Sequence, residues 1–359
     1  MEVGDWKQDD SLLPIFTLED RCKRVNQTAN IRKIIMLITP VLIIGITVIS
    51  VLYGTKEISI ETIWQALFDF DERNADHQII RTSRIPRAIA VLFVGAFLAV
   101  AGAIMQGITR NYLASPSLMG VNDGSAFVIT VAIVFVPGLA NYQMILLSII
   151  GSALGAGLVF GFGAAIKNGL SPVRLAIIGT VIGTFLSSVA SAIAMYFQVS
   201  QTVAAWYNTK IHIVNTDMLL LSIPFGLVGM LIALFCARAI TVTSLGDDIA
   251  VGLGQKTKLI RYLSMIAVVL LTGTAVALVG KIAFVGLVIP HIVRFLVGVD
   301  YRSIIPCSIL VGAFFLSLCD LVSRFINYPF ETPIGVVTAF VGIPFFLYLI
   351  RSRGGDRHA

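Results

Sequence analysis

Ten apolar segments, each about 16 to 24 residues long, divide this chain of 359 residues. A helix satisfies its own backbone hydrogen bonds in hydrocarbon, and about 20 residues are needed to cross a bilayer. We therefore expect an all-α, polytopic membrane protein with ten transmembrane helices. The eighth segment is the weakest, since it is short and contains Pro290, His291 and Arg294. The segments cover residues 34–53, 88–108, 117–136, 143–166, 175–198, 218–240, 262–280, 282–298, 304–319 and 334–350.

The composition excludes a soluble domain. Hydrophobic residues make up 57% of the chain and charged residues 13%, whereas soluble domains have about 25% charged residues. The net charge of +6 needs no nucleic-acid partner, because cytoplasmic loops of membrane proteins are cationic. The four cysteines stand alone and predict neither a disulfide framework nor a metal site.

The loops predict the orientation. With the N-terminus inside, the inner segments hold 17 lysines and arginines and the outer segments hold 8. This excess places both termini in the cytoplasm and the chain in the cell membrane. We expect a cytosolic tail over residues 1–33, a membrane domain over 34–350 and a second cytosolic tail over 351–359. In the largest outer loop, apolar residues from Ile58 to Leu67 recur at near-helical spacing and predict a short surface helix.

Motifs of enzymes are missing from the sequence. There is no Gly-x-x-x-x-Gly-Lys-Ser/Thr loop for ATP and no Gly-x-Ser-x-Gly setting for a nucleophile, and the four histidines are scattered. Two glycine pairs, Gly151/Gly155 and Gly157/Gly161, are spaced four apart within an apolar segment and favour close helix packing. We expect no enzymatic activity, no cofactor and no metal centre.

Three blocks of sequence resemble the permease subunits of ATP-binding-cassette importers for iron chelates and cobalamin. The resemblance covers most of residues 80–350, in order, and implies a ten-span fold. Two departures are Tyr112, where the family usually has proline, and residues 206–209, where it usually has a Trp-x-x-Gly turn. The segment 199–217 therefore stays unassigned. The blocks are residues 84–116, which include RIPR and RNYLASP, residues 280–302, which begin GKIAFVGLVIPH, and residues 312–346, which include ETPIG and GIPFF.

A short helix is predicted between the sixth and seventh segments. Ser244 fits an N-cap, Asp247 lies three residues on as in a capping box, and Gly254 fits a helix end. Such a helix of about nine residues is too short to span and could be an ordinary connector. The resemblance implies that it is the coupling helix that contacts the ATPase. The residues predicted to take part are Leu245, Gly246, Asp247, Asp248, Ala250, Leu253 and Gly254.

The fifth segment carries a stripe of small polar residues on one helix face, namely Thr180, Thr184, Ser187 and Ser191. Such a stripe either packs helices or lines a wet path. In the resembling family the fifth helix borders the translocation path at a two-fold axis, so both interpretations stay open.

Arginines on the outer side are predicted to bind carboxylate side chains of a partner protein. In the resembling family, outer arginines bind glutamates of the substrate-binding protein, and the matching positions are Arg84, Arg87 and Arg324. Their planar forks suit this task. Snorkelling at the interface is the alternative.

These features predict the permease subunit of an importer, with ferric siderophores as the cargo. The resemblance implies a second permease subunit, identical or homologous, two cytosolic ATP-binding subunits and an extracytoplasmic substrate-binding protein. An ion-coupled secondary transporter is the alternative, and it would need carboxylates or a cation site at the membrane midplane. Asp123, expected near the inner third of the third span, is the acidic residue inside a predicted span.

Overall fold

The computed structural model describes residues 18–54, 58–166, 172–208, 210–328 and 330–354. Within these ranges the regular elements are helices. The apolar segments form the longer ones: α1 (Leu18–Leu52), α4 (Ile85–Thr109), α5 (Val121–Phe135), α6 (Asn141–Ala165), α7 (Pro172–Tyr196), α9 (Thr216–Ser244), α11 (Thr257–Val279), α12 (Val285–Val297), α13 (Tyr301–Phe325) and α14 (Ile334–Gly354). Short elements connect them: α2 (Ile60–Phe68), α3 (Ala75–Ile79), η1 (Ile80–Arg84), η2 (Pro116–Met119), α8 (Ser200–Asn208), η3 (Lys210–Ile213) and α10 (Asp247–Gly252).

Each predicted apolar segment overlaps one of the longer helices. In the described part of the chain, seven helical stretches are long and apolar enough to cross a membrane. The remaining three, α5, α12 and the apolar part of α14, are shorter. The all-α class is thus confirmed, while the count of ten spans stays a prediction.

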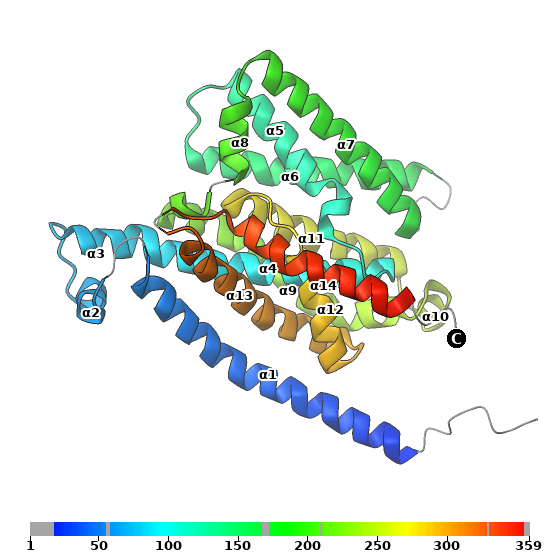
Figure 1. The fold of residues 1–359 in the computed structure, drawn as a ribbon. Helices are drawn as coiled ribbons and strands as arrows, with labels where there is room; N and C mark the ends of the chain where they lie inside the picture. Colours follow the sequence, from blue (N-terminus) through cyan, green and yellow to red (C-terminus); the bar gives the residue numbers. More distant parts are fainter. Residues whose placement is uncertain (1–17, 55–57, 167–171, 209, 329, 355–359) are drawn as a thin grey trace, which may run out of the picture.

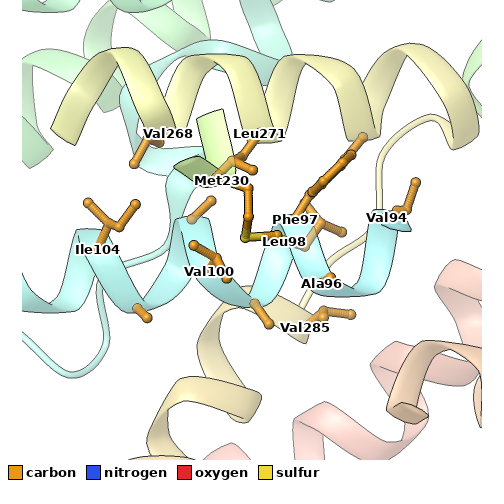
Figure 2. Close-up of a cluster of buried hydrophobic side chains, with 14 of the residues drawn as sticks. Val94, Ala96, Phe97, Leu98, Val100, Ile104, Met230, Val268, Leu271 and Val285 are labelled. Atoms are coloured by element: carbon orange, nitrogen blue, oxygen red, sulfur yellow. The ribbon is translucent and has the colours of Figure 1, made fainter. Parts of the chain in front are cut away.

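The helix α4 lies at the centre of the bundle and contacts α9, α11, α12 and α13. Its composition explains this position, because its many alanines and glycines let neighbouring backbones come close. Figure 2 shows Phe97 of α4 packed beside Leu271 of α11, with Met230 of α9 next to them and Val285 of α12 on the other side. All four side chains belong to one buried apolar cluster.

The remaining helices lie on either side of this centre. Figure 1 shows α5, α6 and α7 together on one side, and α13 followed by α1 on the other. The contacts agree, because α11 joins α4 to α6, and α1 packs along α13. The outermost helices α1 and α7 are the least buried of the seven long apolar stretches. A large part of their surface therefore faces outside the chain.

Glycines set the closest helix crossings. A Cβ added to Gly102 of α4 would lie 1.7 Å from the carbonyl oxygen of Gly286 in α12. The predicted pair Gly151/Gly155 of α6 packs against Gly124 of α5, as expected. The predicted pair Gly157/Gly161 does not pack, because nothing within the described chain lies within 4 Å of a Cβ built there. That pair faces outward, so its expected packing role within the chain is wrong.

Two helices begin inside the bundle rather than at its edge. Gly124, in the first turn of α5, packs halfway along α6, and Gly286, in the first turn of α12, packs partway along α4. At 1.5 Å per residue, the 13 residues of α12 span about 20 Å, less than the roughly 30 Å of hydrocarbon. The irregular segments before these helices are only partly covered by protein: Ala114, Pro116, Gly280 and Ile282 are buried, whereas residues 110–113 and Lys281 are exposed.

Two loop predictions have different outcomes. The surface helix predicted in the largest loop is confirmed as α2, which begins after Ser59, whose hydroxyl caps Thr62. The N-terminal tail is partly helical, since α1 begins at Leu18, well before the predicted first span at residue 34. Residues 1–17 of this tail and 355–359 of the C-terminal tail lie outside the described residues.

The predicted orientation has a direct test. Figure 1 places α2 and α3 at one end of the bundle and α10 at the other. A reporter fused after Ala359 should be cytoplasmic, and an epitope inserted near Asn74 should be accessible from outside, because inner loops carry the excess of lysine and arginine. Labelling intact and permeabilised cells measures both. Labelling on the same side would contradict the ten-span topology.

Candidate functional site

A groove of about 610 Å³ runs along α7, and the four residues of the predicted stripe line it. The helical period brings them onto one face. Gly179 and Gly183 leave room between them, and Ser117, Asp123 and Ser188 complete the lining. The hydroxyls of Thr180 and Ser191 donate to carbonyls one turn back in α7, so they present a mild polar surface. The groove thus has no strong binding group except at Asp123.

Asp123 lies in the first turn of α5 and faces α7. A Cβ on Gly183 would lie 2.7 Å from its Oδ2, so the glycine makes room for the carboxylate. Gly183 is near the middle of α7, and the neighbouring Gly124 packs near the middle of α6. Asp123 therefore lies about halfway through the bundle, deeper than the inner third that the sequence suggested.

A lysine from a distant part of the chain faces this carboxylate. Lys281 Nζ lies 3.4 Å from Asp123 Oδ1 and 5.4 Å from the ring centroid of Tyr207. The Tyr207 hydroxyl lies 3.3 Å from Ser125 Oγ, and burial raises the pKa of its phenol, so the ring stays neutral. The predicted topology counts Lys281 among the outer residues, whereas its ammonium contacts Asp123 in the first turn of α5. Leaving it out of the outer count strengthens the cytoplasmic excess of positive charge.

At the α2 and α3 end, two of the three predicted docking arginines share a buried carboxylate. Arg87 of α4 donates to Asp320 of α13 at 2.9 Å and to both oxygens of Glu331 at 2.7 and 2.8 Å. Arg324 donates to the other oxygen of Asp320. The Asp320 side chain is 1% exposed and that of Glu331 is 30% exposed. Glu331 is thus the part of this network nearest to solvent.

The same arginines cap the end of α1. Arg84 donates to the carbonyls of Val51 and Leu52 at 2.6 and 2.8 Å, and Arg324 donates to those of Ser50 and Tyr53 at 2.7 and 3.0 Å. The last carbonyls of a helix lack partners within it and favour positive charge. Arg84, Arg87 and Arg324 are each at most 7% exposed. Their guanidinium groups donate hydrogen bonds within the chain, whereas we expected them from the sequence to be exposed at the surface.

At the opposite end, α10 is shorter than predicted. It covers six residues, not about nine, because α9 continues through Ser244. The Ser244 hydroxyl donates to Thr241 O, so the predicted N-cap is wrong, and Gly246 takes that position with φ +134°. The capping box is also absent, since the Asp247 carboxylate binds Arg261 at 2.7 Å and lies 3.5 Å from Arg110.

The end of α10 agrees with the prediction. Gly254 has φ +76°, its N–H donates to Val251 O, and the N–H of Gln255 donates to Ala250 O. This is a Schellman motif, in which glycine accepts the left-handed conformation. Asp247 and Asp248 lie in the first turn, where a helix favours negative charge.

The surface of α10 is mostly apolar. Four large side chains on and beside this helix are more than half exposed: Leu245, Ile249, Val251 and Leu253. Ala250, one of the residues predicted to take part in the contact, is fully buried against the chain, so its side chain does not belong to this patch. An exposed apolar patch of this kind typically marks a protein contact.

Sequence reasoning missed two parts of these sites. Val251 extends the patch at α10, and its apolar character within a short connector was the available signal. The contacts of Asp123 with Lys281, of Arg84 with Val51 and of Arg324 with Ser50 had no local signal, because the partners lie 158, 33 and 274 positions away.

Comparisons with known proteins fit this geometry. Residues 41–352 match the FecCD transport family. The chain is 55% identical to the iron-uptake system permease protein FeuB of Bacillus subtilis over 91% of this chain and 98% of that protein. It is 48% identical to the iron(3+)-hydroxamate import system permease protein FhuB of the same organism, over 85% and 79% of the two chains. A solved metal-chelate type ABC transporter in an inward-facing conformation superposes with a TM-score of 0.77 at 31% identity, covering 89% of this chain and 99% of that one.

Proposed function

The chain belongs to the FecCD transport family, and we propose that it forms half of the path through which an ATP-driven importer carries ferric siderophores. Members of this family are multi-pass proteins of the cell membrane and are permease subunits rather than enzymes themselves. The observation that carries the proposal is the groove along α7, which small polar side chains line. The cargo is inferred from the relatives, which are named for iron uptake and iron(3+)-hydroxamate import.

A second permease subunit would complete the path. Thr180, Thr184 and Ser191 are exposed in the single chain, and polar groups facing lipid are costly. A second copy or a homologous subunit set against α7 would turn the open groove into a closed passage. Weak polar walls suit a large chelate, because a site along a transport path must bind the cargo weakly enough to release it.

The other partners are proposed from the two ends of the bundle. The apolar patch at α10 is the proposed contact for one of the two cytosolic ATP-binding subunits, and the second permease would contact the other. The opposite end is the proposed seat of an extracytoplasmic substrate-binding protein. A docking role of Arg84, Arg87 and Arg324 stays a prediction from the resemblance, and exposed Glu331 would be the first group of their network to meet a partner.

An ion-coupled secondary transporter is less well supported. Its coupling ion would need a midplane carboxylate. Asp123 is at that depth, but the Lys281 ammonium already supplies the positive charge at 3.4 Å. Transport should therefore follow ATP hydrolysis and not an ion gradient.

Uptake by the complete importer tests this function and the α10 contact together. In liposomes holding both permeases and ATPases, with binding protein outside and ATP inside, we expect ferric siderophore to accumulate even with a protonophore present. Ile249→Glu and Leu253→Glu should each lower uptake about tenfold or more, because a charge in an apolar contact behaves as a hot-spot loss. Leu253→Met keeps the apolar area and should retain uptake.

Two outcomes would contradict these statements. Accumulation that needs an ion gradient and no ATP would overturn the importer assignment. Full uptake by both glutamate variants would remove α10 from the ATPase contact and leave the importer assignment in place.

A further inference from the structure

The pair of Asp123 and Lys281 joins two segments that the chain order keeps apart. Asp123 belongs to the first turn of α5, and Lys281 belongs to the irregular segment between α11 and α12. Each of these two segments lies at the start of a helix, α5 or α12, whose first turn is inside the bundle. The contact between their side chains, Nζ to Oδ1 at 3.4 Å, therefore links the inner ends of these two segments.

The surroundings hold both charges in place. Asp123 lies against Gly183, where a side chain would collide with the carboxylate. Gly280 has φ +83°, and a Cβ there would be 2.1 Å from the Tyr207 carbonyl oxygen, so the segment carrying Lys281 is pressed onto Tyr207. The Tyr207 ring then faces the ammonium, and such a contact is attractive. Two independent close approaches thus fix the positions from which the charges meet.

Their depth makes the pair costly. Charged side chains inside the bilayer are expensive, and they mark pathways more often than packing. The side chains of Asp123 and Lys281 are 25% and 41% exposed, so the pair is open to the groove rather than sealed in a core. Asp123 itself lines the groove opposite the stripe of α7.

We propose that the Asp123–Lys281 pair is a positioning element that holds the wall of the groove at mid-depth and thereby ties cargo movement to ATP hydrolysis. This rests on the proposed function. While the ions are paired, the start of α5 cannot move away from the segment before α12, and the groove keeps its width. Without the pair, the start of α5 and the segment before α12 can move apart when the ATP-binding subunits do not drive them. ATP is then hydrolysed without transport.

A purely structural pair would behave differently. If the two charges only neutralise each other, removing both together should restore normal transport, because no unpaired charge remains. If they hold the wall, removing both should restore protein abundance but leave transport poorly coupled. The double variant Asp123→Asn with Lys281→Met separates these cases, and Lys281→Arg is a conservative variant that keeps the ion pair.

The measurement is the amount of ferric siderophore moved per ATP hydrolysed by the complete importer in liposomes. We expect the double variant to reach wild-type abundance with this ratio lowered up to about fivefold, because a partly exposed ion pair contributes at most about 1 kcal/mol. Lys281→Arg should keep the ratio. Asp217→Asn, which changes an exposed carboxylate in the first turn of α9, is the matched control and should keep it too.

The outcomes distinguish this inference from the function beneath it. A wild-type complex that moves no siderophore would overturn the proposed function and the inference with it. A working wild-type complex with an equal ratio in the double variant would overturn the positioning role alone. Loss of the ratio in Lys281→Arg as severe as in the double variant would also overturn it, because the ion pair would then not be the cause.

Discussion

Replacing Asp320 by alanine should destabilise the protein by about 3–5 kcal/mol, the cost of leaving buried charges without their partner. Arg87 and Arg324 both bind this carboxylate, which is 1% exposed. Its removal leaves Arg87 with Glu331 and Arg324 with backbone carbonyls as their remaining partners, so Arg324 loses its carboxylate and α13 is loosened from α4. The loss is measured as a lower melting temperature of the purified permease and a smaller folded fraction in the membrane.

Glu331→Gln is the matched control, because Glu331 also binds Arg87 but is 30% exposed. Partly exposed ion pairs contribute about 0–1 kcal/mol, so this variant should melt close to the wild type. Equal melting of Asp320→Ala and the wild type would show that the network does not hold the helices. For the same reason, Arg324→Glu should impair folding as well as docking, which the sequence alone did not indicate.

Gly102→Val should have the second large effect, because the first added carbon would lie 1.7 Å from the Gly286 carbonyl oxygen. Neither backbone can yield without separating α4 from α12. Overpacking of a core typically costs about 1–3 kcal/mol, and this contact belongs at the upper end. Thermal unfolding in detergent measures it, together with the yield of folded protein.

Gly157→Val provides the comparison within a helix of the same kind. No atom of the described chain lies within 4 Å of a Cβ at Gly157. The single permease should therefore tolerate this change, with a melting temperature close to that of the wild type. A Gly102→Val protein as stable as Gly157→Val would contradict the close crossing of α4 and α12.

The long helices could be predicted from the sequence because each of them contains one continuous run of apolar residues, bounded on both sides by polar residues. The stripe on α7 could also be predicted, since residues at a helical period share a face whatever lies opposite. Residue types alone do not tell which of two glycine pairs packs. Gly151/Gly155 meets α5, whereas Gly157/Gly161, on the same helix, faces outward.

Capping and ion pairs were harder to predict for two physical reasons. Ser244 fits an N-cap by residue type, but the tertiary structure lets α9 continue through it, so the cap forms at Gly246. Ion pairs such as Asp123 with Lys281 depend on how helices are placed in space, which no local pattern records. Arg84 and Arg324 could be selected as unusual charges, yet their role as caps of α1 required the fold.

The capping of α1 has a consequence for the order in which the chain matures. The carbonyl and the hydroxyl of Ser50 accept hydrogen bonds from Arg324, which is synthesised 274 residues later. At about 5–20 residues per second, a ribosome needs roughly 14–55 s to cover that distance. Throughout this interval α1 resides in the lipid without α13 beside it. Arg84 can cap the end of α1 early, whereas the contact of α1 with α13 forms only when most of the chain has been made.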